Sequence, residues 1–383
     1  MHSLELCYII SLALRKALMK TKEKARLAQL AEHLTLNQGV EGSNPSSRTE
    51  DAVFGGSRGW HFFLYFLWIS ERRLMIINTG SRTDIPAFFS SWFYNRIREG
   101  YVLVRNPYYP EQILRYRLDP DVVDCLCFCT KNPEPMLERI GELDEFRQLW
   151  YVTITPYGKD IEPYVPHCRD VIRSLQKLSQ AVGKEKVIWR YDPIFITEKY
   201  DLKFHLKMFR KMAEMLSGFT SRCVISFIDL YEKTRRNFPQ AGRVQEKERL
   251  EIGASFAETG EKTGIRIMTC CEGSELELYG VDCGGCMTQE VIEKAIGVNL
   301  QVPARSRNIR EGCSCLLGAD IGAYNTCSHG CLYCYANYDR ESVEYNRKQH
   351  DSESPLLIGH LNPGEVVKEA RQESYIDYQL RLF

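Results

Sequence analysis

Short apolar runs alternate with longer, more polar segments along most of this chain. Six runs rich in β-branched, aromatic and cysteine residues predict strands, at 75–79, 122–129, 149–155, 186–191, 223–228 and 265–270. Segments of helical character lie between them, at 87–99, 132–146, 167–182, 201–216 and 247–263. Strands that alternate with helices favour βα units around a parallel sheet. We therefore predict an α/β fold, a partial (β/α) TIM-type barrel, over residues 75–275.

Polar residues follow the predicted strands. In a barrel the carboxyl ends of the strands meet at one mouth, where ligands bind, so these side chains are expected to share a rim. Each is also an ordinary turn or cap residue, and Asn132 and Asp192 precede prolines that can start turns. As a group they predict a ligand-binding rim made of Arg82, Asp84, Lys131, Asn132, Arg190, Asp192 and Asp229.

Residues 1–74 do not share this pattern. Ala-Gln-Leu-Ala-Glu at 28–32 and Gly-Ser-Asn-Pro at 42–45 resemble the conceptual translation of the D-arm and T-arm of a transfer RNA gene. We predict that this segment comes from an over-extended gene start, with Met75 as the initiator, and exclude it from fold reasoning. The alternative is a genuine extension with a basic helix and an apolar patch.

Composition narrows the classes of function. The 383 residues carry a formal net charge of zero, so no global field draws the protein to nucleic acid or a membrane, although a local basic groove stays open. Fifteen cysteines in a chain of this size favour a reducing compartment and metal ligation over a disulfide framework. The best apolar run, 60–69, is about half the ~20 residues that span a bilayer. We predict a cytoplasmic protein.

Three closely spaced cysteines form the most specific motif. Cys327, Cys331 and Cys334 make a C-x3-C-x2-C run, with Tyr333 just before the last cysteine. Three thiolates can bind three irons of a 4Fe–4S cube and leave the fourth iron open to a small molecule. The alternative is zinc bound by three cysteines and a histidine, but zinc modules usually show two C-x2-C pairs. We predict an iron–sulfur loop over residues 319–345.

This cysteine run resembles the signature of radical S-adenosylmethionine (SAM) enzymes, and its longer string, Cys-Ser-His-Gly-Cys-Leu-Tyr-Cys-Tyr-Ala, resembles the spore photoproduct lyase-like branch. The resemblance implies that a 4Fe–4S cluster cleaves SAM to a 5′-deoxyadenosyl radical, which abstracts hydrogen from a substrate. It implies that Tyr333 contacts the adenine. Arg190 and Asp192 of the predicted rim are the candidate cofactor-binding residues beside it. The resemblance also implies a flavodoxin- or ferredoxin-like reductant.

Three further motifs are similar to an uncharacterised bacterial domain-of-unknown-function family with C-terminal cysteines. They are Ser-Arg-Thr-Asp-Ile-Pro at 81–86, Thr-Lys-Asn-Pro at 130–133 and Trp-Arg-Tyr-Asp-Pro-Ile at 189–194. This resemblance implies no activity. Radical SAM enzymes normally carry the cysteine loop after the first strand, whereas here it follows the last candidate strand. A circular permutation would reconcile the two, because the first and last strands of a nearly closed barrel are neighbours. No convincing glycine-rich SAM-binding motif accompanies the loop.

Other cysteines offer a second metal site in residues 276–318, a Cys-rich connector. Cys283-Gly-Gly-Cys286 and Cys313-Ser-Cys315 could bind zinc or a second iron–sulfur cluster, with Cys270-Cys271 as a weaker source of a ligand. Free thiols are the alternative. Along the strand at 122–129, cysteines at alternate positions lie about 6.6 Å apart, too far for adjacent ligands of one zinc, so we expect them to pack in the core.

Residues 346–383 make up a C-terminal tail. Gln379, Leu380, Leu382 and Phe383 resemble the peptide by which bacterial repair and replication proteins dock on the DNA sliding clamp, and burial in the protein's own core is the alternative. With the lyase-like run, the tail favours DNA as partner. We predict a radical SAM enzyme in DNA repair or nucleic-acid modification. The alternatives are radical SAM chemistry on a peptide or metabolite, and a non-catalytic iron–sulfur or zinc protein that binds nucleic acid or carries electrons.

Overall fold

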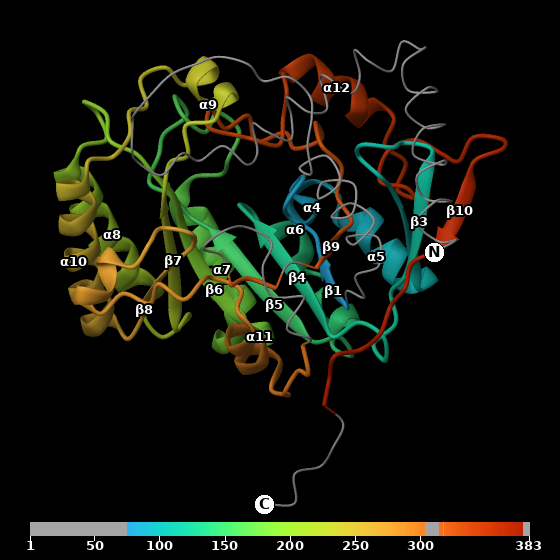
Figure 1. Cartoon of the computed structure of the whole chain (residues 1–383), viewed down its shortest axis with the longest axis horizontal. Coiled ribbons are helices and arrows are strands. Elements are labelled where there is room, and N and C mark those ends of the chain that lie inside the picture. The colour runs from blue at the N-terminus through green and yellow to red at the C-terminus, as the bar shows by residue number, and fades with distance from the viewer. Residues whose placement is uncertain (1–74, 303–313, 317, 378–383) are drawn as a thin grey trace, which may run out of the picture. The chain divides into compact units, whose positions relative to one another are not determined.

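The computed structural model describes residues 75–302, 314–316 and 318–377. They form a mixed α/β fold around a seven-stranded parallel sheet (Figure 1). All six predicted strands are present, and a seventh is added late in the chain. The strands are β1 (Ile76–Asn78), β4 (Cys125–Thr130), β5 (Gln148–Thr153), β6 (Val187–Ile194), β7 (Arg222–Phe227), β8 (Arg266–Thr269) and β9 (Ala319–Asp320).

The strand order is β8-β7-β6-β5-β4-β1-β9. β9 pairs with β1 in parallel, with Ile77 opposite Ala319 and Asn78 opposite Asp320. The first and last strands of this sheet along the chain are therefore neighbours in space, as the permutation hypothesis requires. The predicted α/β class with a parallel sheet is confirmed.

Helices follow the strands as the sequence pattern predicts. Helix α8 begins where the Asp201 carboxylate accepts a hydrogen bond from the Phe204 N–H at 2.7 Å, and α10 ends at Gly264, whose φ of 72° suits a glycine. The α-helices are α4 (Ile85–Phe88), α5 (Ser90–Glu99), α6 (Glu134–Leu137), α7 (Cys168–Val182), α8 (Leu202–Leu216), α9 (Glu232–Asn237), α10 (Glu246–Thr263), α11 (Gln289–Ile296) and α12 (Arg340–Lys348). Three 3-10 helices lie at Ile140–Leu143, Lys184–Lys186 and Glu275–Tyr279.

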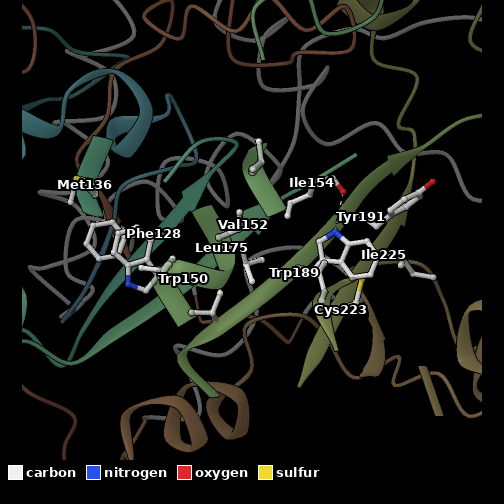
Figure 2. Close-up of a cluster of buried hydrophobic side chains, with 14 of the residues drawn as sticks. Phe128, Met136, Trp150, Val152, Ile154, Leu175, Trp189, Tyr191, Cys223 and Ile225 are labelled. Atoms are coloured by element: carbon white, nitrogen blue, oxygen red, sulfur yellow. Dashed lines mark hydrogen bonds between the residues drawn. The ribbon is translucent and has the colours of Figure 1, made fainter. Parts of the chain in front are cut away.

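One face of the sheet packs against α5, α6, α7, α8 and α10 through a large apolar core. Aromatic rings dominate it: Phe128 stacks on Trp150 with centroids 3.8 Å apart, and Phe209 lies between Trp189 and Phe256. The indole N–H of Trp189 donates to the Ile154 carbonyl at 3.0 Å, so this polar atom is satisfied inside the core (Figure 2). Because strand residues alternate between faces, this packing fixes which side chains reach the opposite face.

The opposite face, which we call the inner face, is apolar near the strand starts. There α11 and residues 315–316 and 375–376 cover it. Cys125 and Cys127 are fully buried in this cluster, which confirms core packing for them, and Cys129 packs against it in a partly buried position. Toward the strand ends the same face carries Arg190 and Asp192 instead of apolar residues.

A second, three-stranded sheet was not predicted. It consists of β2 (Tyr101–Arg105), β3 (Gln112–Arg117) and β10 (Val366–Glu369) in the order β10-β3-β2. Strands β3 and β10 are polar and partly exposed, which weakens their signal, whereas β2 is an apolar run, Tyr-Val-Leu-Val-Arg, that the prediction left out.

Two predictions lie wholly outside the described ranges, the over-extended start at 1–74 and the clamp-binding peptide at 379–383, and so does Cys313 of the predicted second metal site. Of the helices within the described ranges, none combines the length and apolar character that a bilayer span requires.

Candidate metal centre

The loop between β9 and α12, residues 321–339, carries Cys327, Cys331 and Cys334; we call it the cluster loop. Helix α12 follows this loop and α9 follows β7, and Figure 1 shows both at the same end of the sheet. The loop turns at Gly330, whose φ is 69° and where an added Cβ would come within 3.0 Å of the Tyr164 ring. A larger residue would disturb this turn, which lies between the first two cysteines.

The three thiols of the cluster loop interact with one another. Burial raises the pKa of all three, and the nearby Cys334 and Cys331 raise the pKa of Cys327 further. Lys131 acts in the opposite sense on Cys331, and Lys233 does so on Cys334. Nearby backbone N–H groups also lower the pKa values, that of His329 for Cys327 and those of Asn337 and Ala336 for Cys334. Cations and N–H donors around thiolates are the environment that iron–sulfur clusters use.

A buried carboxylate, Glu162, holds the cluster loop through a hydrogen bond from Tyr333. Its Oε1 accepts hydrogen bonds from Lys131 Nζ at 2.9 Å and Thr155 Oγ1 at 2.7 Å, and from the Tyr333 hydroxyl. Burial alone would lower the pKa of Lys131, but Glu162, with Cys331 and Asp192, raises it above its usual range. Tyr333 is thus held in place by a residue that the sequence analysis missed.

His329 also anchors the loop. Its Nε2 lies 2.8 Å from Asp84, which accepts the backbone N–H groups of Lys131 at 2.8 Å and Ala87 at 3.0 Å as well. The ring packs against Phe88, with centroids 4.6 Å apart. This agrees with a loop-shaping role for the histidine. Within the described residues, its ring nitrogens and the three loop sulfurs do not gather within 4.8 Å of one another, so no three-cysteine, one-histidine zinc site is assembled.

The predicted rim residues lie around this loop in part. Arg190 and Asp192 form an ion pair, and the Ser226 hydroxyl donates to Asp192 at 2.5 Å. Asp192 and Cys331 both act on the charge of Lys131, so all three lie in one neighbourhood. Arg82 pairs with Asp320 of β9 at 2.8 Å. By contrast, the Asn132 side chain accepts a hydrogen bond from its own turn, and Asp229 is exposed beside Tyr231.

Glu272, just beyond β8, is a second residue of this region that the sequence did not predict. It accepts the Phe227 N–H at 2.8 Å and pairs with Arg249 at 3.4 Å. Burial nevertheless raises the pKa of Glu272 to about 8, outweighing both partners. Nothing in the local sequence distinguishes this glutamate from a surface residue.

A separate group of cysteines could bind a metal ion. The sulfurs of Cys270, Cys286 and Cys315, which we call the inner trio, all lie within 4.8 Å of one another, and those of Cys286 and Cys315 are 3.6 Å apart. Two of these three belong to the predicted second site. Cys283 lies outside the trio, with its thiol directed at the Val281 carbonyl, and Cys270, the weaker prediction, takes its place. Cys313 lies outside the described residues.

Comparisons with known proteins give a family but no activity. A family described as "Domain of unknown function (DUF1848)" matches residues 76–336. No curated protein matches the chain. A solved structure with a similar region is the carboxyl transferase domain of pyruvate carboxylase from Rhizobium etli with pyruvate, at 11% identity and a TM-score of 0.26. The match covers 66% of this chain and 47% of that chain, so this chain spans about half the length of that structure.

Proposed function

The chain belongs to the DUF1848 family, and we propose that it is a radical SAM enzyme whose 4Fe–4S cluster is held by Cys327, Cys331 and Cys334. One observation carries the proposal. The loop with these cysteines follows an edge strand, β9, which pairs in parallel with β1. Read from β9, the sheet has seven parallel strands in succession, with the cysteine loop after the first. A permuted partial barrel accounts for this arrangement.

The residues of the loop fit such a cluster. In a 4Fe–4S cube each thiolate binds a different iron, so the three sulfurs stand farther apart than the ligands of one ion. The sulfurs of the inner trio gather within 4.8 Å, whereas those of the cluster loop, also within the described residues, do not. Three thiolates leave one iron open, and the cluster, when bound, supplies the electron and the open iron for the cleavage of SAM.

The chain's own residues position the reactants. The Tyr333 hydroxyl is bonded to Glu162, which fixes the ring beside Cys334. The resemblance gives this tyrosine an adenine contact, and the fixed ring is consistent with that role. Arg190 and Asp192 offer a cation and an anion at the strand ends for the polar groups of the cofactor. Their mutual ion pair is partly exposed, so a ligand can reach it.

The surface beside the cluster loop favours a nucleic-acid substrate. Tyr164, Tyr335 and Tyr338 are exposed there, although large apolar side chains are usually buried. Lys233 lies 4.1 Å from the ring centre of Tyr338, and Arg340 donates to the Tyr164 hydroxyl at 3.0 Å. Exposed rings beside cations are the elements that bind single-stranded nucleic acid by stacking and charge. Radical SAM chemistry on a peptide or metabolite is the alternative, and a protein that fails to bind oligonucleotides would favour it.

The experiment is an assay of 5′-deoxyadenosine with the full chain, purified and reconstituted without oxygen and reduced with dithionite. We expect deoxyadenosine from SAM, and its loss in Cys331→Ala. Cys283→Ser is the matched control, because Cys283 is partly buried and belongs to neither group of cysteines. A protein that binds iron but leaves SAM intact would refute the enzyme and favour an electron-transfer or binding protein.

A further inference from the structure

We propose that Cys270, Cys286 and Cys315 bind a single Zn²⁺ ion that is structural and independent of the cluster loop. The spacing of the sulfurs carries this inference. Zn–S bonds of about 2.3 Å in a tetrahedron place the sulfurs about 3.8 Å apart. The Cys286 and Cys315 sulfurs are 3.6 Å apart, and all three lie within 4.8 Å of one another. The trio therefore suits one ion rather than a cube of four irons.

The backbone around the trio is shaped for a thiolate. The Met287 N–H donates to the Cys315 sulfur at 3.3 Å. Gly285 has a φ of 117°, in the region that favours glycine, and an added Cβ would lie 3.6 Å from the same sulfur. The Tyr151 hydroxyl donates to the Cys286 carbonyl at 2.7 Å, which fastens this turn to the inner face of the sheet. The turn, the glycine and the N–H donor together hold the Cys286 and Cys315 sulfurs at the spacing expected of two ligands of one zinc ion.

The chemistry of the donors selects the metal. Three thiolates are soft ligands, which suit zinc and exclude Mg²⁺ or Ca²⁺. Cys286 and Cys315 are buried, and buried thiolate ligands are typical of structural zinc. Cys270 and burial raise the pKa of the Cys286 thiol, and the nearby Arg190 guanidinium acts in the opposite sense. Three cysteines leave one tetrahedral position for a fourth donor from outside the trio.

The ion would tie three separate parts of the chain together. Cys270 follows β8, Cys286 precedes α11, and Cys315 lies in the segment that leads to β9. Residues 270–318 connect β8 and β9, which are the two ends of the sheet. A zinc ion at this point would hold this connecting segment against the inner face. It would also hold α11, whose Val291, Ile292 and Ala295 cover the apolar part of that face.

The test is the metal content of the full chain, purified without oxygen and without added zinc. We expect about one zinc per chain in the wild type and in Cys331→Ala, and none in Cys286→Ser or Cys315→Ser. The matched control is Cys283→Ser, on the same turn as Cys286, which should keep its zinc. Zinc retained in Cys286→Ser, or iron and sulfide retained at this site in Cys331→Ala, would overturn the proposal.

A second measurement does not depend on the folding of a variant. X-ray absorption at the zinc edge of the wild-type chain should show at least three sulfur neighbours at about 2.3 Å. A first shell of nitrogen and oxygen would contradict the proposal. So would a peptide map under non-reducing conditions that shows a disulfide between Cys286 and Cys315. Because these readouts ignore SAM, the zinc site can fail while the proposed enzyme stands, and the reverse.

Discussion

The two cysteine groups of this protein differ in how the chain brings their sulfurs together. The cluster loop carries its three cysteines within eight consecutive residues, 327–334, at the ends of the strands. The inner trio draws one cysteine each from three distant segments, and it lies against the apolar inner face. Among the described residues, the sulfurs of the inner trio lie within 4.8 Å of one another, whereas those of the cluster loop do not. The cluster loop also has charged neighbours, Lys131 and Glu162. Different spacing predicts different metals, and the two groups can be separated experimentally.

The largest expected effect is the loss of iron from the cluster loop. Cys334→Ala removes one of three ligands, and we expect the reconstituted chain to lose nearly all of its iron and sulfide, about four of each. Zinc should stay at the level of the wild type. Iron and zinc are measured on the same sample by elemental analysis. An equal loss of both metals would show that the two groups are one site.

The next largest effect is expected from the buried ion pair between Glu162 and Lys131, beside the cluster loop. In Glu162→Gln, Lys131 keeps its buried charge without its partner, so we expect the free energy of unfolding to fall by about 3–5 kcal/mol. Glu134→Gln is the matched control: its partner Lys177 is well exposed, and the loss should stay below about 1 kcal/mol. Urea unfolding under anaerobic conditions measures both. Equal losses would contradict the role given to Glu162.

Glu272, two residues after Cys270, should make the free energy of unfolding depend on pH. Its pKa is about 8 in the folded protein against 4.5 ordinarily. Between these values the folded state binds more protons than the unfolded state, so stability falls as pH rises through this window, by up to about 1.4 kcal/mol per pH unit. Glu272→Gln should flatten that slope. Urea midpoints measured across the window check it, and an unchanged slope would refute the assignment.

The smallest expected changes concern α11. Loss of the inner ion in Cys315→Ser should speed hydrogen exchange in α11 and leave α7, on the other face of the sheet, as in the wild type. Mass spectrometry of peptides from the two helices compares them directly. Faster exchange in both would indicate general unfolding rather than release of the connector.

The sequence predicted the parts of this fold that depend on local pattern. The strands β1 and β4 to β8 are short apolar runs, and α7, α8 and α10 are long enough to show helical character. The cluster loop is visible in the sequence because its three cysteines lie within eight residues. That the first and last strands are neighbours could only be a hypothesis, because pairing between distant strands leaves no local signal in the sequence. The structure pairs β9 with β1 in parallel.

The rest depends on contacts between distant segments. Cys283 looked equivalent to Cys286, because Cys-Gly-Gly-Cys reads as a pair, but the turn directs the two thiols to different neighbours. Glu162 lies in a loop after β5, and its role exists only once Lys131 and Tyr333 are folded against it. In the small sheet, β3 and β10 are too polar to stand out in the sequence, and β10 finds its partner β3 more than 250 residues away.

The most direct test of the central claim is the EPR spectrum of the dithionite-reduced full chain with and without SAM. If Cys327, Cys331 and Cys334 hold a cluster with one open iron, SAM binds that iron and the spectrum shifts, and the signal disappears in Cys331→Ala. A reduced-cluster signal that SAM leaves unchanged would contradict the account, as would a chain that binds only zinc.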